Sequence, residues 1–305
     1  MKGIVAVVLL AGCNAALGLD PGTPLDPDAP SCLTGWRYRA PIDIDNEAGP
    51  LVDYQVPVTV AASADLRFAL DDGLPPLRYE ADGEQIWVDV PELPNGRTRL
   101  YAYWGNPSAA AWSGGSPFVD GVISNASFEQ SGAWTIDPPI GPQAAFQPTT
   151  SWASDSRRSL GIDLEVNGDN RPQALSSISQ IVSFPPGGDY VVRFDLDIVV
   201  ASYGYEVNPD TGAMGAINQG GFDMDLGNGF EALWSMYATD NISGPHLDLE
   251  TGPIGAGPSQ LRFAVTITGG SGHGYAKANL DHLRVRRFAS PEPIAMVGAR
   301  EAMCD

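Results

Sequence analysis

The sequence predicts an all-β protein, built from two antiparallel β-sandwiches in series. Several runs alternate apolar and polar residues with a period of two and end at Gly, Pro or Asp, which is typical of half-buried antiparallel strands. The chain of 305 residues contains 35 glycines and 26 prolines, which favour turns, and no window has a convincing 3.6-residue apolar stripe. With 43% hydrophobic residues, the chain can bury two ordinary cores.

The first folded segment, residues 32–119, contains several short strands. Its alternating runs span residues 42–46, 54–60, 86–90 and 99–104. Pro57 lies inside the second of these runs. Because proline cannot donate a hydrogen bond to a neighbouring strand, we expect this strand at a sheet edge or at a bulge.

The second folded segment, residues 120–289, contains the clearest strand, over residues 190–200. One face of this strand carries a row of large apolar side chains, namely Tyr190, Val192, Phe194, Leu196, Ile198 and Val200. Two further strands are expected over residues 261–268 and 280–285. The Gly- and Asn-rich stretch 203–230 is an insertion without an assigned structure. Residues 290–305 are expected to form a C-terminal segment that returns to the first domain.

The chain opens with a segment that is typical of secretory signals. A basic start at Lys2 is followed by an apolar run over residues 4–10 and by small residues before Cys13. The run is too short to span a bilayer, which takes about 20 residues. With a cysteine directly after the small residues, the segment resembles the lipobox of bacterial lipoproteins. The alternatives are an ordinary N-terminal strand and a soluble secreted protein.

The lipobox resemblance implies how the mature protein is held. Residues 1–12 would be cleaved as a signal peptide, and Cys13 would carry lipid that anchors the protein in the bacterial cell envelope. Asn14 after Cys13 favours the outer membrane under the enterobacterial sorting rule. Residues 13–31 are rich in Pro, Asp and Gly and lack any period, so we expect a flexible tether.

The other two cysteines, Cys32 and Cys304, lie at the start and the end of the folded region. Outside the cytoplasm such a pair usually oxidises, and the termini of a domain often lie close together. We therefore expect a Cys32–Cys304 disulfide; the alternative is two free thiols.

The net charge of −20 opposes binding to nucleic acid and to anionic lipid surfaces by long-range repulsion. Contact with a membrane is therefore expected only through the N-terminal lipid. The excess of carboxylates is compatible with bound calcium, although it more often keeps a surface protein soluble.

Residues 32–119 resemble the family catalogued as domain of unknown function 2341. The similarity rests on Gly35-Trp36-Arg37-Tyr38-Arg39, on Asp53-Tyr54-Gln55-Val56-Pro57-Val58 and on Tyr101-Ala102-Tyr103-Trp104-Gly105-Asn106-Pro107, and covers nearly the whole segment. The resemblance implies a β-sandwich and a surface role, and it implies no catalytic residue.

Residues 120–289 resemble galactose-binding-like jelly rolls, as in carbohydrate-binding module families 4 and 9. The similarity rests on Ile123-Ser124-Asn125-Ala126-Ser127-Phe128-Glu129 with Trp134, and on the closing Asn279-Leu280-Asp281-His282-Leu283-Arg284-Val285. The resemblance implies a structural calcium ion between Glu129 and Asp281.

The residues themselves give a second reason to expect calcium. Asp281 has the same strand parity as Leu283 and Val285, so we expect it to point inward, and a buried carboxylate needs a cation or a set of donors. Calcium prefers carboxylate and carbonyl oxygens. The alternatives are a salt bridge to Arg157 or Arg158 and simple solvation at a strand end.

Sugar-binding modules stack sugar rings on exposed aromatic side chains. The candidates outside the clean strands are Trp152, Trp234, Tyr203, Tyr205 and Tyr237. The alternative for each of them is packing in the core, where most Trp and Tyr side chains lie.

These features together predict a non-enzymatic, lipid-anchored cell-surface protein that binds carbohydrate. Its expected partner is a polysaccharide or another polymer of the cell envelope. The alternatives are a glycan-active hydrolase and a purely structural envelope component without a ligand. For a hydrolase the candidate carboxylates are Asp223 and Asp225, which alternate on one strand face. The same spacing is also typical of the solvated face of a strand.

Overall fold

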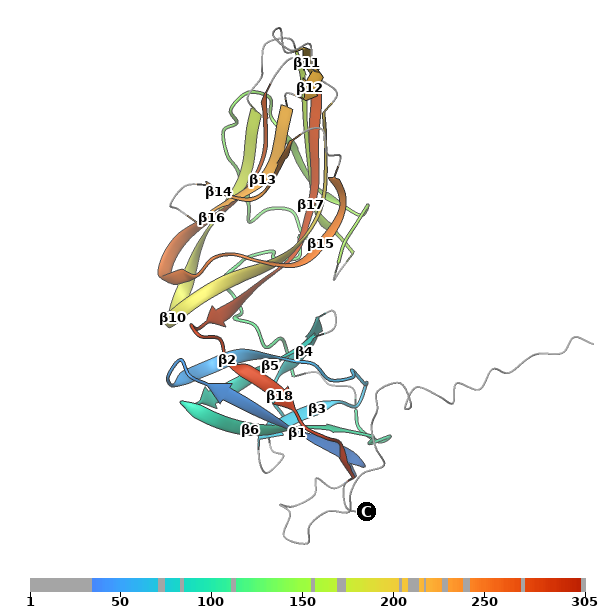
Figure 1. Ribbon diagram of the computed structural model, residues 1–305, viewed down its shortest axis with the longest axis vertical. Coiled ribbons are helices and arrows are strands. Elements are labelled where there is room, and N and C mark those ends of the chain that lie inside the picture. The colour runs from blue at the N-terminus through green and yellow to red at the C-terminus, as the bar shows by residue number, and fades with distance from the viewer. Residues whose placement is uncertain are drawn as a thin grey trace, which may run out of the picture. The chain divides into compact units, whose positions relative to one another are not determined.

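A computed structural model describes most of the chain after residue 34. The described residues are 35–70, 75–82, 85–110, 114–154, 157–168, 174–202, 205–207, 214–216, 218–226, 230–237, 242–269 and 272–302. The chain divides into two compact units (Figure 1). One comprises Met1–Pro117 with Ala289–Asp305, and the other comprises Phe118–Phe288.

The prediction of an all-β protein is confirmed, because every regular element among the described residues is a strand and the strand pairs are antiparallel. Within the same residues, no helix is long and apolar enough to cross a membrane.

The first unit is a sandwich of two sheets. One sheet has the order β18-β1-β6-β3, with β19 also pairing with β1. Its strands are β1 (Tyr38–Asn46), β3 (Arg67–Leu70), β6 (Gly96–Trp104), β18 (Ile294–Val297) and β19 (Glu301–Ala302). The other sheet has the order β2-β5-β4, with β2 (Leu51–Val58), β4 (Tyr79–Asp82) and β5 (Gln85–Leu93). Apolar side chains from both sheets form one core, including Ile42, Leu100, Val56 and Val88.

Pro57 lies in β2, which pairs only with β5 among the described strands. The strand is therefore at a sheet edge, one of the two positions that the sequence predicts. On the unpaired side of an edge strand, proline's missing N–H breaks no hydrogen bond to a neighbouring strand. The C-terminal strands β18 and β19 extend the other sheet. There the Arg39 guanidinium, which is nearly fully buried, donates to Glu301 at 2.6 Å.

A carboxylate fixes the turn that follows β6. Asp65 Oδ2 accepts the backbone N–H groups of Gly105 and Asn106, each at 2.6 Å. Burial acts to raise the pKa of Asp65, but hydrogen bonds from Ser63 and from these amides outweigh it and hold the pKa below its usual value. Gly105 has a φ of +86°, which favours glycine.

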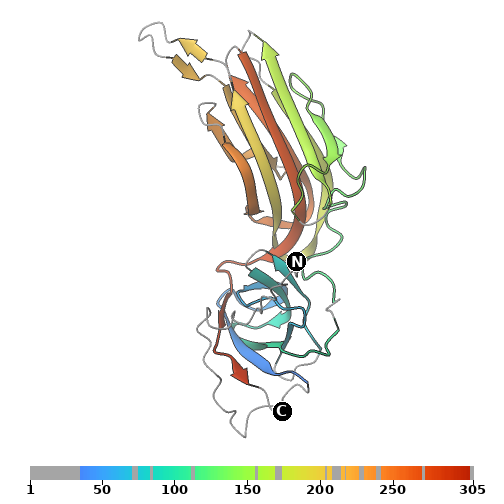
Figure 2. The same ribbon diagram turned by 90° about the vertical axis from the view of Figure 1, so that its right-hand side faces the viewer.

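The second unit is a jelly roll with nine strands in its main sheet system, in the order β14-β13-β16-β10-β17-β9-β8, with β15 and β7 also pairing with β10. The bounds are β7 (Thr135–Ile136), β8 (Ala145–Thr149), β9 (Ser159–Gly168), β10 (Ala174–Ser202), β13 (Asn218–Asp225), β14 (Phe230–Tyr237), β15 (Ile242–Glu250), β16 (Ile254–Gly269) and β17 (Gly272–Phe288). A separate pair joins β11 (Tyr205–Val207) to β12 (Met214–Ala216). The long strands run side by side (Figure 2).

The long strand β10 serves both layers of this sandwich. Its first half, up to Phe184, pairs with β16 and β7. Its second half, from Asp189, pairs with β17 and β15, and Asp189 and Tyr190 at its start also pair with β16. The change falls at Pro185-Pro186-Gly187-Gly188, where Gly187 has a φ of +101°. The predicted apolar row of this strand is buried, from Tyr190 to Ile198. Side chains from both halves of β10 share one core with those of β16 and β17.

Candidate functional site

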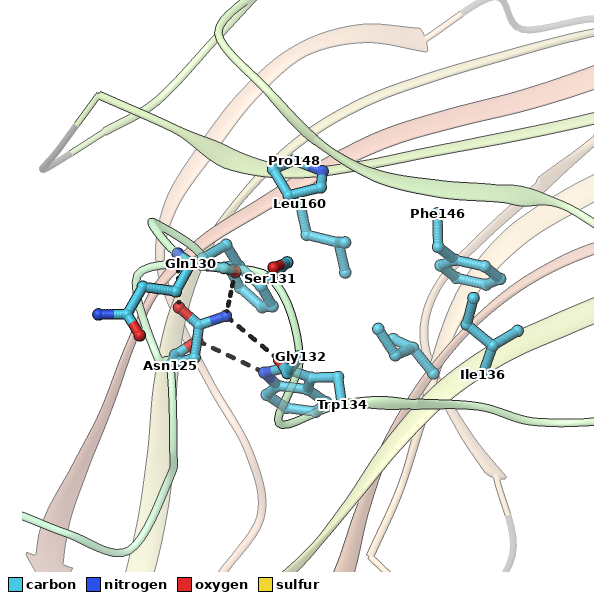
Figure 3. A pocket seen from close by; sticks show the side chains of 11 residues that line it. Asn125, Gln130, Ser131, Gly132, Trp134, Ile136, Phe146, Pro148 and Leu160 are labelled. Atoms are coloured by element: carbon cyan, nitrogen blue, oxygen red, sulfur yellow. Dashed lines mark hydrogen bonds between the residues drawn. The ribbon is translucent and has the colours of Figure 1, made fainter.

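A pocket of about 180 Å³ opens on the second unit, where strands of the two layers meet the turn between residues 125 and 132 (Figure 3). Eleven residues line it and none of them is charged: Asn125, Phe128, Gln130, Ser131, Gly132, Trp134, Ile136, Phe146, Pro148, Leu160 and Ile178.

The pocket lies at the edge of the sandwich. Ile136 and Ile178 come from β7 and β10 of one layer, and Phe146 and Leu160 come from β8 and β9 of the other. Because β8 ends its side of the sheet and β7 pairs only with β10 among the described strands, no further strand closes the gap between the layers there. At this pocket, the apolar core of the unit opens outward.

The lining residues form an inner wall and a rim. Phe128, Leu160 and Ile178 belong to the core and are nearly fully buried. Trp134 and Phe146 are partly buried, whereas 50% of Ile136 is exposed. A ligand that enters the pocket therefore covers apolar surface that the protein leaves in water.

The turn beside the pocket is fixed by the side chain of Asn125. Its Nδ2 donates to the carbonyl oxygens of Gln130 at 2.7 Å and Gly132 at 3.4 Å, and its Oδ1 accepts the N–H of Gln130 at 3.1 Å. Asn125, Phe128 and Ala133 all have positive φ angles. Non-glycine residues keep this conformation only where the surroundings impose it, so the turn is rigidly built.

Gln180 of β10 ties the same turn to the sheet. Its Oε1 accepts the N–H of Ser124 at 2.8 Å, and its Nε2 donates to the carbonyl oxygens of Ser124 and Ala133 at 3.1 and 2.9 Å. The buried side-chain amide of Gln180 therefore holds the segment 124–133, which precedes Trp134, at both of its ends.

The indole of Trp134 is fixed by packing and by one hydrogen bond. Its ring centroid lies 5.5 Å from that of Phe128 and 6.0 Å from that of Phe263. The indole N–H donates to the carbonyl oxygen of Asn125 at 3.4 Å. A ring held in this way loses little conformational freedom when a ligand binds to it.

Asp137 anchors the edge strand that carries Ile136. Its two carboxylate oxygens accept the hydroxyls of Ser177 and Ser179 at 2.7 and 2.8 Å, and Arg262 Nε lies 3.0 Å from Oδ2. These contacts join β7 to β10 and β16 on the side of the sheet away from the core. Asp137 thus positions one wall of the pocket without lining it.

Asp223 and Asp225 alternate in β13 as the sequence predicts. Asp225 is buried and lies 3.4 Å from Arg262, so the interpretation as a solvated strand face does not hold for it. Burial raises the pKa of Asp223, although a hydrogen bond from Thr266 acts in the opposite direction. Neither carboxylate lines the pocket.

The predicted aromatic ligands are only partly described. Trp152 is partly buried, its carbonyl oxygen accepts the Ser159 hydroxyl at 2.6 Å, and it does not line the pocket. The backbones of Tyr205, Trp234 and Tyr237 lie in β11 and β14, but their side chains are outside the described part of the chain, as is the whole of Tyr203. Their roles as ligands therefore stay predictions.

Sequence reasoning missed the aromatic side chains that line this pocket. Trp134 and Phe128 entered only as parts of a family motif, and Phe146 was not selected at all. No local pattern marks Phe146, because its place at the pocket depends on the pairing of β8 with β9.

Glu129 and Asp281 both bind the connection between β8 and β9. Glu129 Oε1 accepts the N–H groups of Arg157 and Arg158 at 2.7 and 2.8 Å, and Asp281 Oδ2 accepts the N–H of Ser154 at 2.9 Å. These backbone donors provide part of the stabilisation that a cation would provide. No group of three or more His, Cys, Asp or Glu among the described residues could hold a metal ion, so calcium stays a prediction.

The expectation that Asp281 shares a strand face with Leu283 is wrong. Asp195 pairs with Asp281 and Arg193 with Arg284, which leaves one extra residue in β17, and His282 has a φ of +54°. This bulge reverses the alternation, so Leu280 and Leu283 both belong to the core while Asp281 lies on the other face. Asp281 is nevertheless completely buried.

The remaining predicted residues, Cys13, Cys32 and Cys304, lie outside the described residues. Lipid attachment and the disulfide therefore stay predictions.

No family model matches the chain, and no curated protein matches it. The resemblance of residues 32–119 to domain of unknown function 2341 therefore stays a prediction.

Several solved structures are similar to parts of the chain. The module TmCBM61, solved in complex with β-1,4-galactotriose, is 14% identical with a TM-score of 0.31, over 55% of this chain and 98% of that one. The C-terminal family 22 carbohydrate-binding module of Clostridium thermocellum Xyn10B is 14% identical with a TM-score of 0.28, over 53% and 90%. The enzymatically active domain of bacteriophage CBA120 tailspike protein 4 is 16% identical with a TM-score of 0.31, over 55% of this chain and only 21% of that one.

Proposed function

We propose that the second unit binds carbohydrate, without chemical turnover, in the pocket beside Trp134. The observation that carries this proposal is a fixed, partly exposed indole that faces an uncharged pocket with a second aromatic side chain, Phe146, in its lining. A sugar ring presents C–H groups on its faces, and these groups pack well on a flat aromatic ring. A small number of polar groups at the turn can fix its orientation.

The size of the pocket limits what enters it. Pockets for drug-sized ligands have volumes of about 300 to 1,000 Å³. At about 180 Å³, this pocket accepts one sugar ring or part of one rather than an oligosaccharide. We therefore expect weak binding with little dependence on salt, because the contacts are stacking and neutral hydrogen bonds.

Binding fits this pocket better than hydrolysis does. Glycoside hydrolysis needs two carboxyl groups that flank the scissile bond. The lining of the pocket contains no carboxylate, and Asp225 is engaged with Arg262.

The partner we propose is a polysaccharide or another polymer of the bacterial cell envelope. Support comes from the sequence of the N-terminus, where the segment before Cys13 resembles a lipobox. A lipid on Cys13 and the tether over residues 13–31 would hold the binding unit at the surface of a membrane. The membrane we propose is the outer membrane, which Asn14 after Cys13 favours. Replacement of Cys13 by Ala should move the protein from the membrane fraction to the soluble fraction. An unmodified Cys13 in the mature membrane-bound protein would rule the anchor out.

The binding proposal can be tested with a glycan array. The full chain should bind at least one neutral glycan, and Phe146→Ala should lower that binding about tenfold or more. Ile181→Ala is the matched control, because Ile181 is 73% exposed and does not line the pocket. Absence of binding to every glycan, or equal loss in both variants, would contradict the proposal.

A further inference from the structure

We infer that the sugar bound in this pocket is neutral and carries a methyl or acetyl group, as in a 6-deoxy or N-acetyl sugar, and that the methyl end of this group enters the pocket. The inference rests on the proposed function, and it names the chemical class of the ligand. It follows from three properties of the pocket: its charge, the placement of its polar atoms and its inner wall.

The pocket has no charged side chain in its lining, in a protein whose net charge is −20. An acidic sugar would meet no cation there, and the long-range field of the protein would oppose its approach. A basic sugar would leave its charge without a partner in an apolar site, which is costly. The ligand is therefore neutral.

The polar side chains of the lining lie on one side. In Figure 3, Asn125, Gln130 and Ser131 lie on the turn, and Ile136 and Phe146 lie on the opposite side. The amide of Asn125 is engaged within the turn, and the side-chain amide of Gln130 is directed away from the pocket. Among the eleven lining residues, Ser131 is the one that carries a hydroxyl group.

The rest of the lining is apolar. Seven of the eleven lining residues are Phe, Trp, Ile, Pro or Leu, and they include the buried inner wall of Phe128, Leu160 and Ile178. A hydroxyl group placed against this wall would lose its hydrogen bonds to water and gain none. The methyl group of a 6-deoxy or N-acetyl sugar has no hydrogen bonds to lose there and buries apolar surface. A plain hexose, with a hydroxyl at every position, therefore fits worse than a sugar with one such substituent.

Two pairs of sugars test the inference, because the members of each pair differ at one position. L-Fucose has a methyl group where L-galactose has a hydroxymethyl group, and N-acetylglucosamine has an acetamido group where glucose has a hydroxyl. With the full chain, ligand-observed NMR titration should show at least one substituted sugar binding about tenfold more tightly than its parent.

A matched pair of variants locates the effect. Ile136→Ser should abolish the preference for the substituted sugar over its parent, because it places a hydroxyl in the pocket wall. Ile140→Ser should leave the preference unchanged, because Ile140 is similarly exposed, at 53%, but does not line the pocket. Equal binding within both pairs, or a preference that survives Ile136→Ser, would overturn the inference.

The failure of the inference can be told apart from the failure of the proposed function. If other glycans bind and Phe146→Ala removes that binding, but neither substituted sugar is preferred, the inference is wrong and the function stands. If no glycan binds at all, both are wrong.

Discussion

Carboxylates that accept backbone N–H groups hold the loops of both units. Asp65 does so for the turn after β6, and Glu129 and Asp281 do so for the connection between β8 and β9. A hydrogen bond to a charged acceptor is roughly twice as strong as one between neutral groups. Part of the acidic excess of this chain is therefore structural.

Asp137 is the carboxylate whose loss should affect the pocket most. Asp137→Ala removes the acceptor of the Ser177 and Ser179 hydroxyls and an ion-pair partner of Arg262, and the two serines are nearly fully buried. Because buried groups left without a partner are costly, we expect the free energy of unfolding to fall by about 1 to 3 kcal/mol. Denaturant unfolding measures this, and sugar affinity should fall in parallel.

The control for this variant is Asp163→Ala. Asp163 forms an ion pair with Lys277 at 3.0 Å, but both side chains are about half exposed. Such a pair contributes about 0 to 1 kcal/mol. A loss of stability in the Asp163 variant that equals the loss in the Asp137 variant would show that Asp137 is no special anchor.

The turn after β6 depends on a glycine for two separate reasons. Gly105 has a positive φ, and a Cβ atom there would lie 2.9 Å from Tyr38 Cδ2 and 3.1 Å from Arg37 Cβ. We expect Gly105→Ala to lower the free energy of unfolding by more than about 1 to 3 kcal/mol, which is the range for backbone strain alone.

Gly49→Ala separates the two reasons. Gly49 has a φ of +94°, close to that of Gly105, but a Cβ there would meet nothing within 4 Å. Gly49→Ala should therefore lower the free energy of unfolding by the backbone strain alone, without a contribution from a steric clash of the Cβ atom. Equal losses in the two variants, measured by thermal unfolding, would mean that the contact with Tyr38 is relieved by a small shift.

The connection between β8 and β9 is the element at which calcium would act. A metal ion that binds only the folded state stabilises it by an amount set by its concentration and affinity. If calcium joins Glu129 and Asp281, a chelator should lower the melting temperature, and Asp281→Asn should remove that response. If the melting temperature is insensitive to the chelator, the backbone N–H groups of this connection suffice and calcium has no structural role here.

The strands could be predicted from the sequence because alternation is local. The runs at residues 42–46 and 190–200 lie inside β1 and β10, and Pro57 limited β2 to a sheet edge or a bulge, of which the structure has the edge. The face of Asp281 could not be predicted, because the bulge at His282 reverses the alternation and leaves no mark in the sequence. The pocket was missed for a related reason. Trp134 directly precedes β7 and Phe146 lies in β8, and these consecutive strands join different layers, because β7 pairs with β10 and β8 pairs with β9. That these two residues line one pocket depends on this long-range pairing and not on a local pattern.

The described C-terminal strands, β18 and β19, belong to the first unit. Tyr38 in β1 pairs with Ala302 in β19. Cys32 precedes Tyr38 by six residues (38 − 32), and Cys304 follows Ala302 by two (304 − 302). Few residues therefore separate each cysteine from a point where the two ends of the chain are already hydrogen-bonded. This pairing supports the predicted disulfide, although the cysteines themselves lie outside the described residues.

A Cys32–Cys304 disulfide would close a loop that contains the whole second unit. In the chain-entropy model, a loop of this length stabilises the folded state by about 5 kcal/mol, and measured values are often lower. Mass spectrometry of non-reduced, alkylated protein should therefore find neither thiol modified. The double variant Cys32→Ser, Cys304→Ser should unfold at lower denaturant concentration, and a reducing agent should lower the midpoint of the parent protein but not of the variant. Two alkylated thiols in the non-reduced protein would contradict the disulfide.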